Sequence, residues 1–164
     1  MINVTKAYLP DIDRYYQLIK RAWDKSWLTN NGELVQELEN RLKEFLGVKH
    51  LYFCSNGTIA LQIAIKALGI KGEVITTPFS YVATTNALLW EGCTPVFVDI
   101  DPTTFCIDPD KIEASINSHT TAILVTHVYG YACNIEKIEL IAQKYKLKLI
   151  YDGAHAFGSQ YKGK

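Results

Sequence analysis

The first fifty residues place apolar and polar side chains with the period of an α-helix. Between residues 11 and 23 the apolar side chains recur at steps of three and four, which predicts an amphipathic helix. Residues 34–45 repeat this pattern, and Gly47 is placed to end the second helix in a left-handed turn. The link between them, residues 26–32, is rich in turn-forming residues and carries an unexpectedly large apolar side chain, Trp27. We therefore expect two helices joined by a loop.

After Gly47, short apolar runs of strand length alternate with longer helical patterns. Strands are predicted at residues 51–54, 73–77, 95–100, 122–128 and 147–151. Helices are predicted at residues 58–68, 81–90, 109–116 and 135–145, and Asp108 before Pro109 provides an N-cap and a first-turn proline for the third of them. This order predicts a three-layer α/β/α fold with a mainly parallel sheet, whose ligands bind beyond the carboxyl ends of the strands.

Composition and charge narrow the classes of function. Of the 164 residues, 48% are apolar, which is enough for a sizeable core. Seventeen basic residues balance seventeen acidic ones, so binding to nucleic acid or to an anionic membrane is disfavoured. The first residues are too polar for a signal peptide and no later run approaches a membrane span, so we expect a cytoplasmic protein. We expect buried thiols, with no metal site or disulfide, at the widely spaced Cys54, Cys93, Cys106 and Cys133.

The first strand-to-helix turn, residues 54–61, suits a phosphate group. Backbone N–H groups at a helix N-terminus are unpaired, and Gly57 has no side chain to keep an anion away. The alternative, equally supported by this turn alone, is that Ser55 or Asn56 simply caps the helix. The turn has neither a P-loop nor a dinucleotide-binding glycine motif, which argues against a Rossmann-like nucleotide-binding module.

Two further turns carry candidate ligand-binding side chains. In residues 77–85, Phe79 or Tyr81 is placed to face a planar ring, although each aromatic taken alone is more often part of a core. The turn after the last strand carries Asp152 and, three residues later, His155. A buried carboxylate needs a cation or strong hydrogen bonds, and a protonated pyridine nitrogen is such a partner. The alternative is an aspartate that caps the next turn beside a satisfied histidine.

Four stretches of the chain resemble, in order and spacing, successive blocks of one enzyme family. They read SWLTNNGELVQELENRL, SNGTIALQIAIKALGIKGEVITTPFSYVATTNAL, GCTPVFVDIDPTTFCID and LIYDGAHAFGSQYKGK. The family they resemble is the DegT/DnrJ/StrS sugar aminotransferases, which use pyridoxal 5′-phosphate (PLP) and have the aspartate-aminotransferase fold of the fold-type I enzymes. Together the stretches span nearly the whole chain.

The resemblance implies roles for residues of all three turns. The cofactor phosphate would be held by Gly57, Thr58 and Ile59. Tyr81 would stack on the pyridine ring, and His155 would lie beside it near the phenolic oxygen. Asp152 would pair with the ring nitrogen and keep it protonated, so that the ring takes up electrons when an amino donor loses its α-proton. Asp152 and His155 are therefore the expected catalytic residues. The link between the first two helices resembles the loop at the active-site entrance, which adds two secondary candidates for substrate contact, Trp27 and Thr29.

The resemblance also implies that the chain is the N-terminal part of a longer enzyme. Residues 1–30 would form the first helix and the entrance loop, residues 31–164 an incomplete PLP-binding large domain, and the small C-terminal domain would be absent. The family's Schiff-base lysine lies a further strand and turn beyond the block that contains Asp152, so we assign that role to neither Lys162 nor Lys164.

The full-length protein is expected to be a homodimer that moves an amino group from an amino acid, glutamate, to a keto sugar. Two alternatives stay open. One is a sugar dehydratase of the same family, dependent on PLP or its aminated form, in which histidine replaces the lysine. The other is a non-catalytic truncated remnant or interaction module.

Overall fold

The computed structural model describes residues 6–163, and their contacts divide the chain into two units, residues 1–53 and residues 54–164. Residues 31–53, which we expected to belong to the cofactor-binding domain, lie in the first unit. Lys164 lies outside the described residues. No helix among residues 6–163 is long and apolar enough to cross a membrane.

The first unit contains both predicted N-terminal helices. Helix α1 (Ile12–Asp24) begins after Asp11, whose carboxylate accepts a hydrogen bond of 3.0 Å from the N–H of Arg14. Helix α2 (Glu33–Leu46) ends at Gly47, which has the left-handed conformation that we predicted, with φ of 64°. The two helices are linked by Arg21, which forms ion pairs with Glu33 and Glu37.

The predicted strand at residues 51–54 is wrong, because these residues form irregular backbone. None of the described strands pairs with this run. Instead, the N–H of Phe53 donates a hydrogen bond of 2.8 Å to the Glu39 side chain. An apolar run becomes a strand only where another strand accepts its backbone hydrogen bonds, and the pattern of side chains carries no information about that partner.

The second unit is built on a four-stranded sheet in which every pair of neighbouring strands is parallel. The strands lie in the order β2-β1-β3-β4 and span Thr94–Phe97, Glu73–Thr76, Thr120–Thr126 and Lys148–Asp152. The expectation of a mainly parallel sheet is confirmed. The chain adds β2 on one side of β1 and then adds β3 and β4 on the other side. The direction in which strands are added therefore reverses between β1 and β3. Crevices at such a position are the usual ligand sites of parallel sheets.

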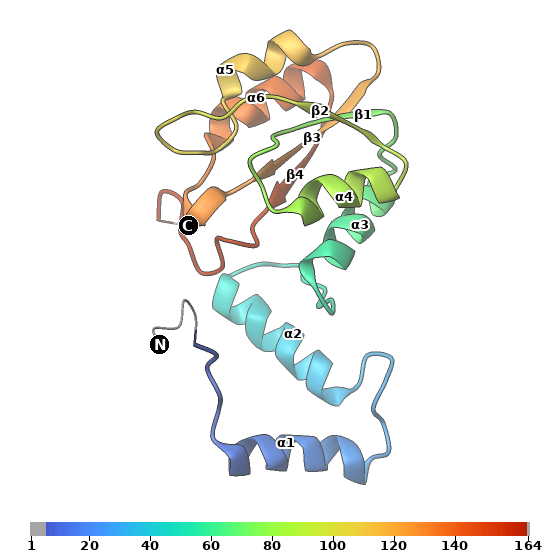
Figure 1. Cartoon of the computed structure of the whole chain (residues 1–164). Helices are drawn as coiled ribbons and strands as arrows, with labels where there is room; N and C mark the ends of the chain where they lie inside the picture. Colours follow the sequence, from blue (N-terminus) through green and yellow to red (C-terminus); the bar gives the residue numbers. More distant parts are fainter. Residues whose placement is uncertain (1–5, 164) are drawn as a thin grey trace. The chain divides into compact units, whose positions relative to one another are not determined.

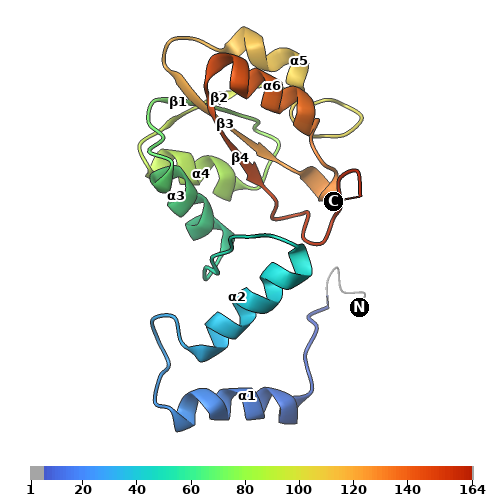
Figure 2. The same ribbon diagram turned by 180° about the vertical axis from the view of Figure 1, so that it is seen from behind.

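Helices cover both faces of this sheet, as Figures 1 and 2 show from opposite sides. Helices α3 (Gly57–Ala67) and α4 (Val82–Trp90) pack on one face, while α5 (Pro109–Ile112) and α6 (Ile135–Tyr145) pack on the other. The 3₁₀ turn η1 (Glu113–Ser115) continues α5, and η2 (Val128–Gly130) follows β3. The predicted cap of α5 is present, because the Asp108 carboxylate accepts a hydrogen bond from the N–H of Asp110.

Alternate strand residues enter the two cores. Ile75, Ile123 and Val125 pack towards α5 and α6, whereas Val74 and Leu124 pack towards α3 and α4. All four cysteines are free thiols, and three of them are buried as expected: Cys93, Cys106 and Cys133. Cys54 is only partly buried. The sheet is thus covered on both faces, and the ends of its strands are left to form a site.

Candidate active site

In the first turn, the N-terminus of α3 keeps two backbone N–H groups free for a ligand. The Asn56 side chain caps α3 by accepting a hydrogen bond of 3.0 Å from the N–H of Ile59, as the capping alternative anticipated. This bond leaves the N–H groups of Gly57 and Thr58, which precede Ile59 at the start of the helix, without an intrahelical acceptor. A Cβ added to Gly57 would meet no atom within 4 Å. The cap and an open anion-binding position therefore coexist here, and the role predicted for Ile59 stays a prediction.

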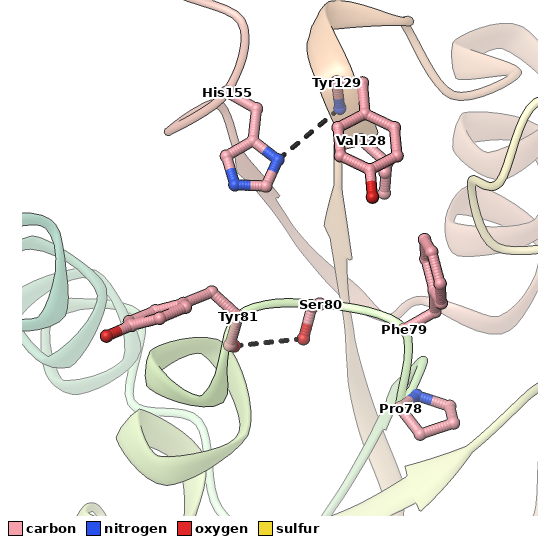
Figure 3. A pocket seen from close by; sticks show the side chains of 7 residues that line it. All are labelled: Pro78, Phe79, Ser80, Tyr81, Val128, Tyr129 and His155. Carbon is pink, nitrogen blue, oxygen red and sulfur yellow. Dashed lines mark hydrogen bonds between the residues drawn. The ribbon is translucent and has the colours of Figure 1, made fainter. Parts of the chain in front are cut away.

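The second turn contains two aromatic side chains, which lie in different surroundings. Phe79 stacks on Phe105 with ring centroids 5.8 Å apart and meets Tyr129 edge to face at 6.4 Å. Tyr81 comes directly before α4 and is 71% exposed. Figure 3 shows its ring pointing away from Phe79 and Tyr129. Of the two aromatics considered from the sequence, Tyr81 is the more accessible to a planar ligand, since Phe79 is 40% exposed.

Asp152 is a buried carboxylate with neutral hydrogen-bond donors. It ends β4 and is 9% exposed. One carboxylate oxygen accepts a hydrogen bond of 2.8 Å from the Thr84 hydroxyl, and the other accepts one of 3.0 Å from the N–H of Ala154. The second bond is the turn-capping contact that the alternative interpretation proposed. Asp152 forms no ion pair with any residue among 6–163, so its charge has no cationic partner there.

His155 lies opposite the second turn, as Figure 3 shows. Its ring stacks on Tyr129 with centroids 6.1 Å apart and planes inclined by 9°, and its Nδ1 lies 3.5 Å from the N–H of Tyr129. Tyr129 adopts the left-handed conformation, with φ of 54°, and its ring contact Phe105 does so as well, with φ of 60°. Such backbone is costly for bulky residues and is concentrated at functional sites.

The three turns meet at two neighbouring cavities. One has a volume of about 210 Å³, and among its lining residues are Gly57, Thr58, Tyr81, Thr84, Asp152 and His155. The other has a volume of about 330 Å³ and is lined by Pro78, Phe79, Ser80, Tyr81, Val128, Tyr129 and His155. Tyr81 and His155 line both. The structure therefore brings together five of the six predicted cofactor-binding residues, all but Ile59.

Three residues at or near the cavities were missed from the sequence. Thr84 holds the Asp152 carboxylate, and Thr126 lines the smaller cavity. A threonine within an apolar helix or strand was the only signal available for either. His127 follows Thr126 and accepts a hydrogen bond of 3.1 Å at Nδ1 from the N–H of Cys133. Burial lowers the pKa of His127, which favours the neutral ring that this bond requires.

The two substrate candidates of the entrance loop belong to the first unit. The Trp27 side chain is 46% exposed, and the backbone N–H of Trp27 donates a hydrogen bond to the carbonyl oxygen of Ala22. Thr29 is also exposed. Both are accessible to a ligand, and their contact with substrate stays a prediction.

The sequence and the fold match those of known proteins. Residues 11–164 match the model of the DegT/DnrJ/EryC1/StrS aminotransferase family. The chain is 52% identical over 162 residues to the dTDP-4-amino-4,6-dideoxy-D-glucose transaminase of Escherichia coli, covering 99% of the chain and 44% of that enzyme. It is 39% identical over 165 residues to the GDP-perosamine synthase of Caulobacter vibrioides, again covering 99% of the chain and 44% of the relative. The chain thus spans less than half the length of these curated relatives.

Solved structures agree. The crystal structure of DesI in the presence of its TDP-sugar product superposes with a TM-score of 0.90 at 40% identity, covering 93% of the chain and 39% of DesI. NtdA from Bacillus subtilis with bound cofactor PMP gives a TM-score of 0.87 at 36% identity, covering 93% of the chain and 35% of NtdA.

Proposed function

Because the chain belongs to the DegT/DnrJ/EryC1/StrS aminotransferase family, we propose that the protein carrying it transfers an amino group from an amino acid to a nucleotide-linked keto sugar. PLP is the proposed cofactor, and glutamate is the proposed amino donor, leaving as 2-oxoglutarate. In this proposal the lysine that holds the cofactor lies beyond residue 164. The names of the transaminase and the perosamine synthase support a nucleotide sugar as the acceptor.

The observation that carries this proposal is Asp152, a buried carboxylate without a cationic partner among residues 6–163, at a cavity that also contains a free helix N-terminus. A phosphorylated pyridine has a group for each of these features. Its phosphate suits unpaired N–H groups and the positive end of a helix dipole, and its protonated nitrogen suits a desolvated carboxylate. The residues present therefore fit the cofactor.

Each residue has a separate task. The N–H groups of Gly57 and Thr58 bind the phosphate, and Tyr81 covers a face of the ring. Asp152 holds a proton on the ring nitrogen, and the Thr84 hydroxyl fixes the orientation of that carboxylate. His155, stacked on Tyr129, closes the site beside the ring. When bound, PLP supplies an electron sink for the bond broken at the α-carbon of the amino donor.

Two broader properties belong to the same proposal. We propose that the protein is cytoplasmic. We also propose that it works as a homodimer. The support for association within the chain is the apolar surface of α1, where Tyr16, Ile19 and Trp23 are between 38% and 70% exposed.

The proposal is tested by incubating the whole protein with PLP, ¹⁵N-labelled glutamate and a dTDP-linked 4-keto-6-deoxy sugar. The expected products, identified by mass spectrometry, are a ¹⁵N-labelled amino sugar nucleotide and an equal amount of 2-oxoglutarate. Omission of PLP from protein stripped of its cofactor should abolish both.

Two other outcomes would favour the alternative functions. A sugar product that has lost a hydroxyl group and gained no nitrogen would indicate the dehydratase. Failure of the whole protein to bind either PLP or PMP would contradict the cofactor assignment itself and favour a non-catalytic role.

A further inference from the structure

We propose that Thr126 is a positioning residue of the cofactor site, whose hydroxyl hydrogen-bonds a polar atom of the bound pyridine ring. Thr126 ends β3 and is 2% exposed, and its Oγ1 has no hydrogen-bond partner among residues 6–163. The same residue lines the cavity of about 210 Å³ that contains Asp152. The inference rests on the proposed function, since it takes a phosphorylated pyridine as the ligand.

The sheet places Thr126 beside Asp152. The two are register partners at the carboxyl ends of β3 and β4, so their side chains lie on the same face of the sheet. That face is the one covered by α3 and α4, and α4 supplies Thr84 to the same cavity. The Thr84 hydroxyl is satisfied by Asp152 at 2.8 Å. Two threonines therefore line one cavity, and of their hydroxyl groups only that of Thr126 has no hydrogen-bond partner among residues 6–163.

An unpaired buried hydroxyl destabilises a fold, whereas valine has nearly the same shape and carries no such penalty. Packing alone therefore gives no reason for threonine at this position. The same is true of Thr76, whose buried hydroxyl is also unpaired, but Thr126 lines the cavity, where a ligand can supply the missing hydrogen bond. In the proposed function the neighbouring carboxylate faces the protonated ring nitrogen, so the polar atom that Thr126 would meet is that N–H, from which its hydroxyl oxygen can accept a hydrogen bond beside the one to Asp152.

The chain contains a matched control. Thr76 ends β1, is fully buried, and also has a hydroxyl without a partner among residues 6–163. Unlike Thr126, it is absent from the linings of both cavities at the site. Loss of the Thr76 hydroxyl should therefore affect the fold in a similar way but leave cofactor affinity unchanged.

The test uses the whole protein and PMP, which binds without a covalent bond to lysine. The dissociation constant of PMP and the melting temperature of the ligand-free protein are measured for the parent, Thr126→Val, Thr126→Ser and Thr76→Val. Thr126→Val should weaken PMP binding about fivefold, the value expected for one hydrogen bond. Thr126→Ser should stay within about twofold of the parent, because it keeps the hydroxyl, and Thr76→Val should match the parent. Neither valine variant should melt at a lower temperature than the parent.

The outcomes separate this inference from the proposed function. If the parent binds PMP and Thr126→Val binds it equally well, the inference is wrong and the proposed function stands. If Thr126→Val lowers the melting temperature of the ligand-free protein, the hydroxyl has a structural partner, which also overturns the inference. If the parent binds neither PMP nor PLP, both fall together.

Discussion

At the residue scale, the charge of Asp152 and the space in front of Gly57 are the features that a cofactor would use. Both residues were identified as candidates from the sequence, because a carboxylate after a buried strand and a glycine at a helix start are local signals. Thr84 and Thr126 were not predicted. Their importance depends on α4 and β3 lying next to β4, which no local pattern encodes.

Asp152→Asn tests the charge. The amide keeps the size of the side chain and can still accept the Thr84 hydroxyl at its oxygen, but it cannot hold a proton on the ring nitrogen by charge. In the whole protein we expect kcat to fall by about 100-fold or more, while the affinity for PMP falls by less than about tenfold. Steady-state kinetics at saturating PLP and a PMP titration measure the two effects. A variant with nearly the parent kcat would show that Asp152 is not the partner of the ring nitrogen.

Gly57→Val tests the anion site. A Cβ at position 57 meets no atom within 4 Å, so we expect the ligand-free protein to keep its fold and melting temperature. The added side chain would occupy the approach to the N-terminus of α3 and should weaken PMP binding by about tenfold or more, the cost of lost charge-assisted hydrogen bonds. Binding of pyridoxamine, which has no phosphate, serves as the control and should change little. Equal losses for both ligands would argue against a phosphate at this helix.

At the element scale, local signals predicted helices better than strands. All of the predicted helices exist, because capping residues and helical periodicity act within a few residues of one another. Helix α6, which begins at Ile135 with Asn134 as its N-cap, matches the predicted bounds. Helix α4 begins one residue later than predicted, and α5 is four residues shorter than predicted and continues as a 3₁₀ turn. The strand predicted at residues 51–54 is absent, because its formation depends on a partner far away in the chain. The strand predicted at residues 95–100 ends at Phe97, and the one predicted at residues 122–128 spans residues 120–126.

Acid should weaken the link between helices α1 and α2, because Glu33 forms ion pairs that are lost when its carboxylate is protonated. Hydrogen bonds from Arg21, then from Lys25, lower the pKa of Glu33 from its ordinary 4.5 to about 2. The folded state therefore binds this proton less readily than the unfolded state, and the stabilisation is fully present above about pH 4.5 and is lost as the pH falls towards about 2. The unfolding free energy of the whole protein, measured across this range, should fall less steeply in Glu33→Gln. Parallel curves would contradict the role of this ion pair.

At the scale of the whole molecule, the sequence predicted the class of fold and the edge of the sheet where the site lies. The alternation of strands and helices was sufficient for both, because parallel strands connected by helices leave one natural place for ligands. The order β2-β1-β3-β4 was not predicted, since periodicity does not say on which side of β1 each later strand is added.

The exposed face of α1 should make the segment of residues 1–164 self-associate when it is produced alone. Its large apolar side chains include Trp23, which is 70% exposed. Light scattering should show a mean mass that rises with concentration, and Trp23→Asp should reduce the rise, whereas Lys20→Gln on the same helix should not. A monomer at all concentrations for the parent segment would contradict this expectation.

The outer edge of β4, the side that faces away from β3, should exchange its amide hydrogens with solvent faster than the inner side. Among residues 6–163 this strand pairs only with β3, and the carbonyl of Asp152 accepts the N–H of His127 from that side. Since the N–H groups of a strand alternate in direction, those of Ile150 and Asp152 face β3, while those of Leu149 and Tyr151 face outward. In D₂O the first two should exchange slowly and the last two quickly. If Leu149 and Tyr151 were also protected in the whole protein, a further strand would pair with the outer edge of β4, the strand that ends at Asp152.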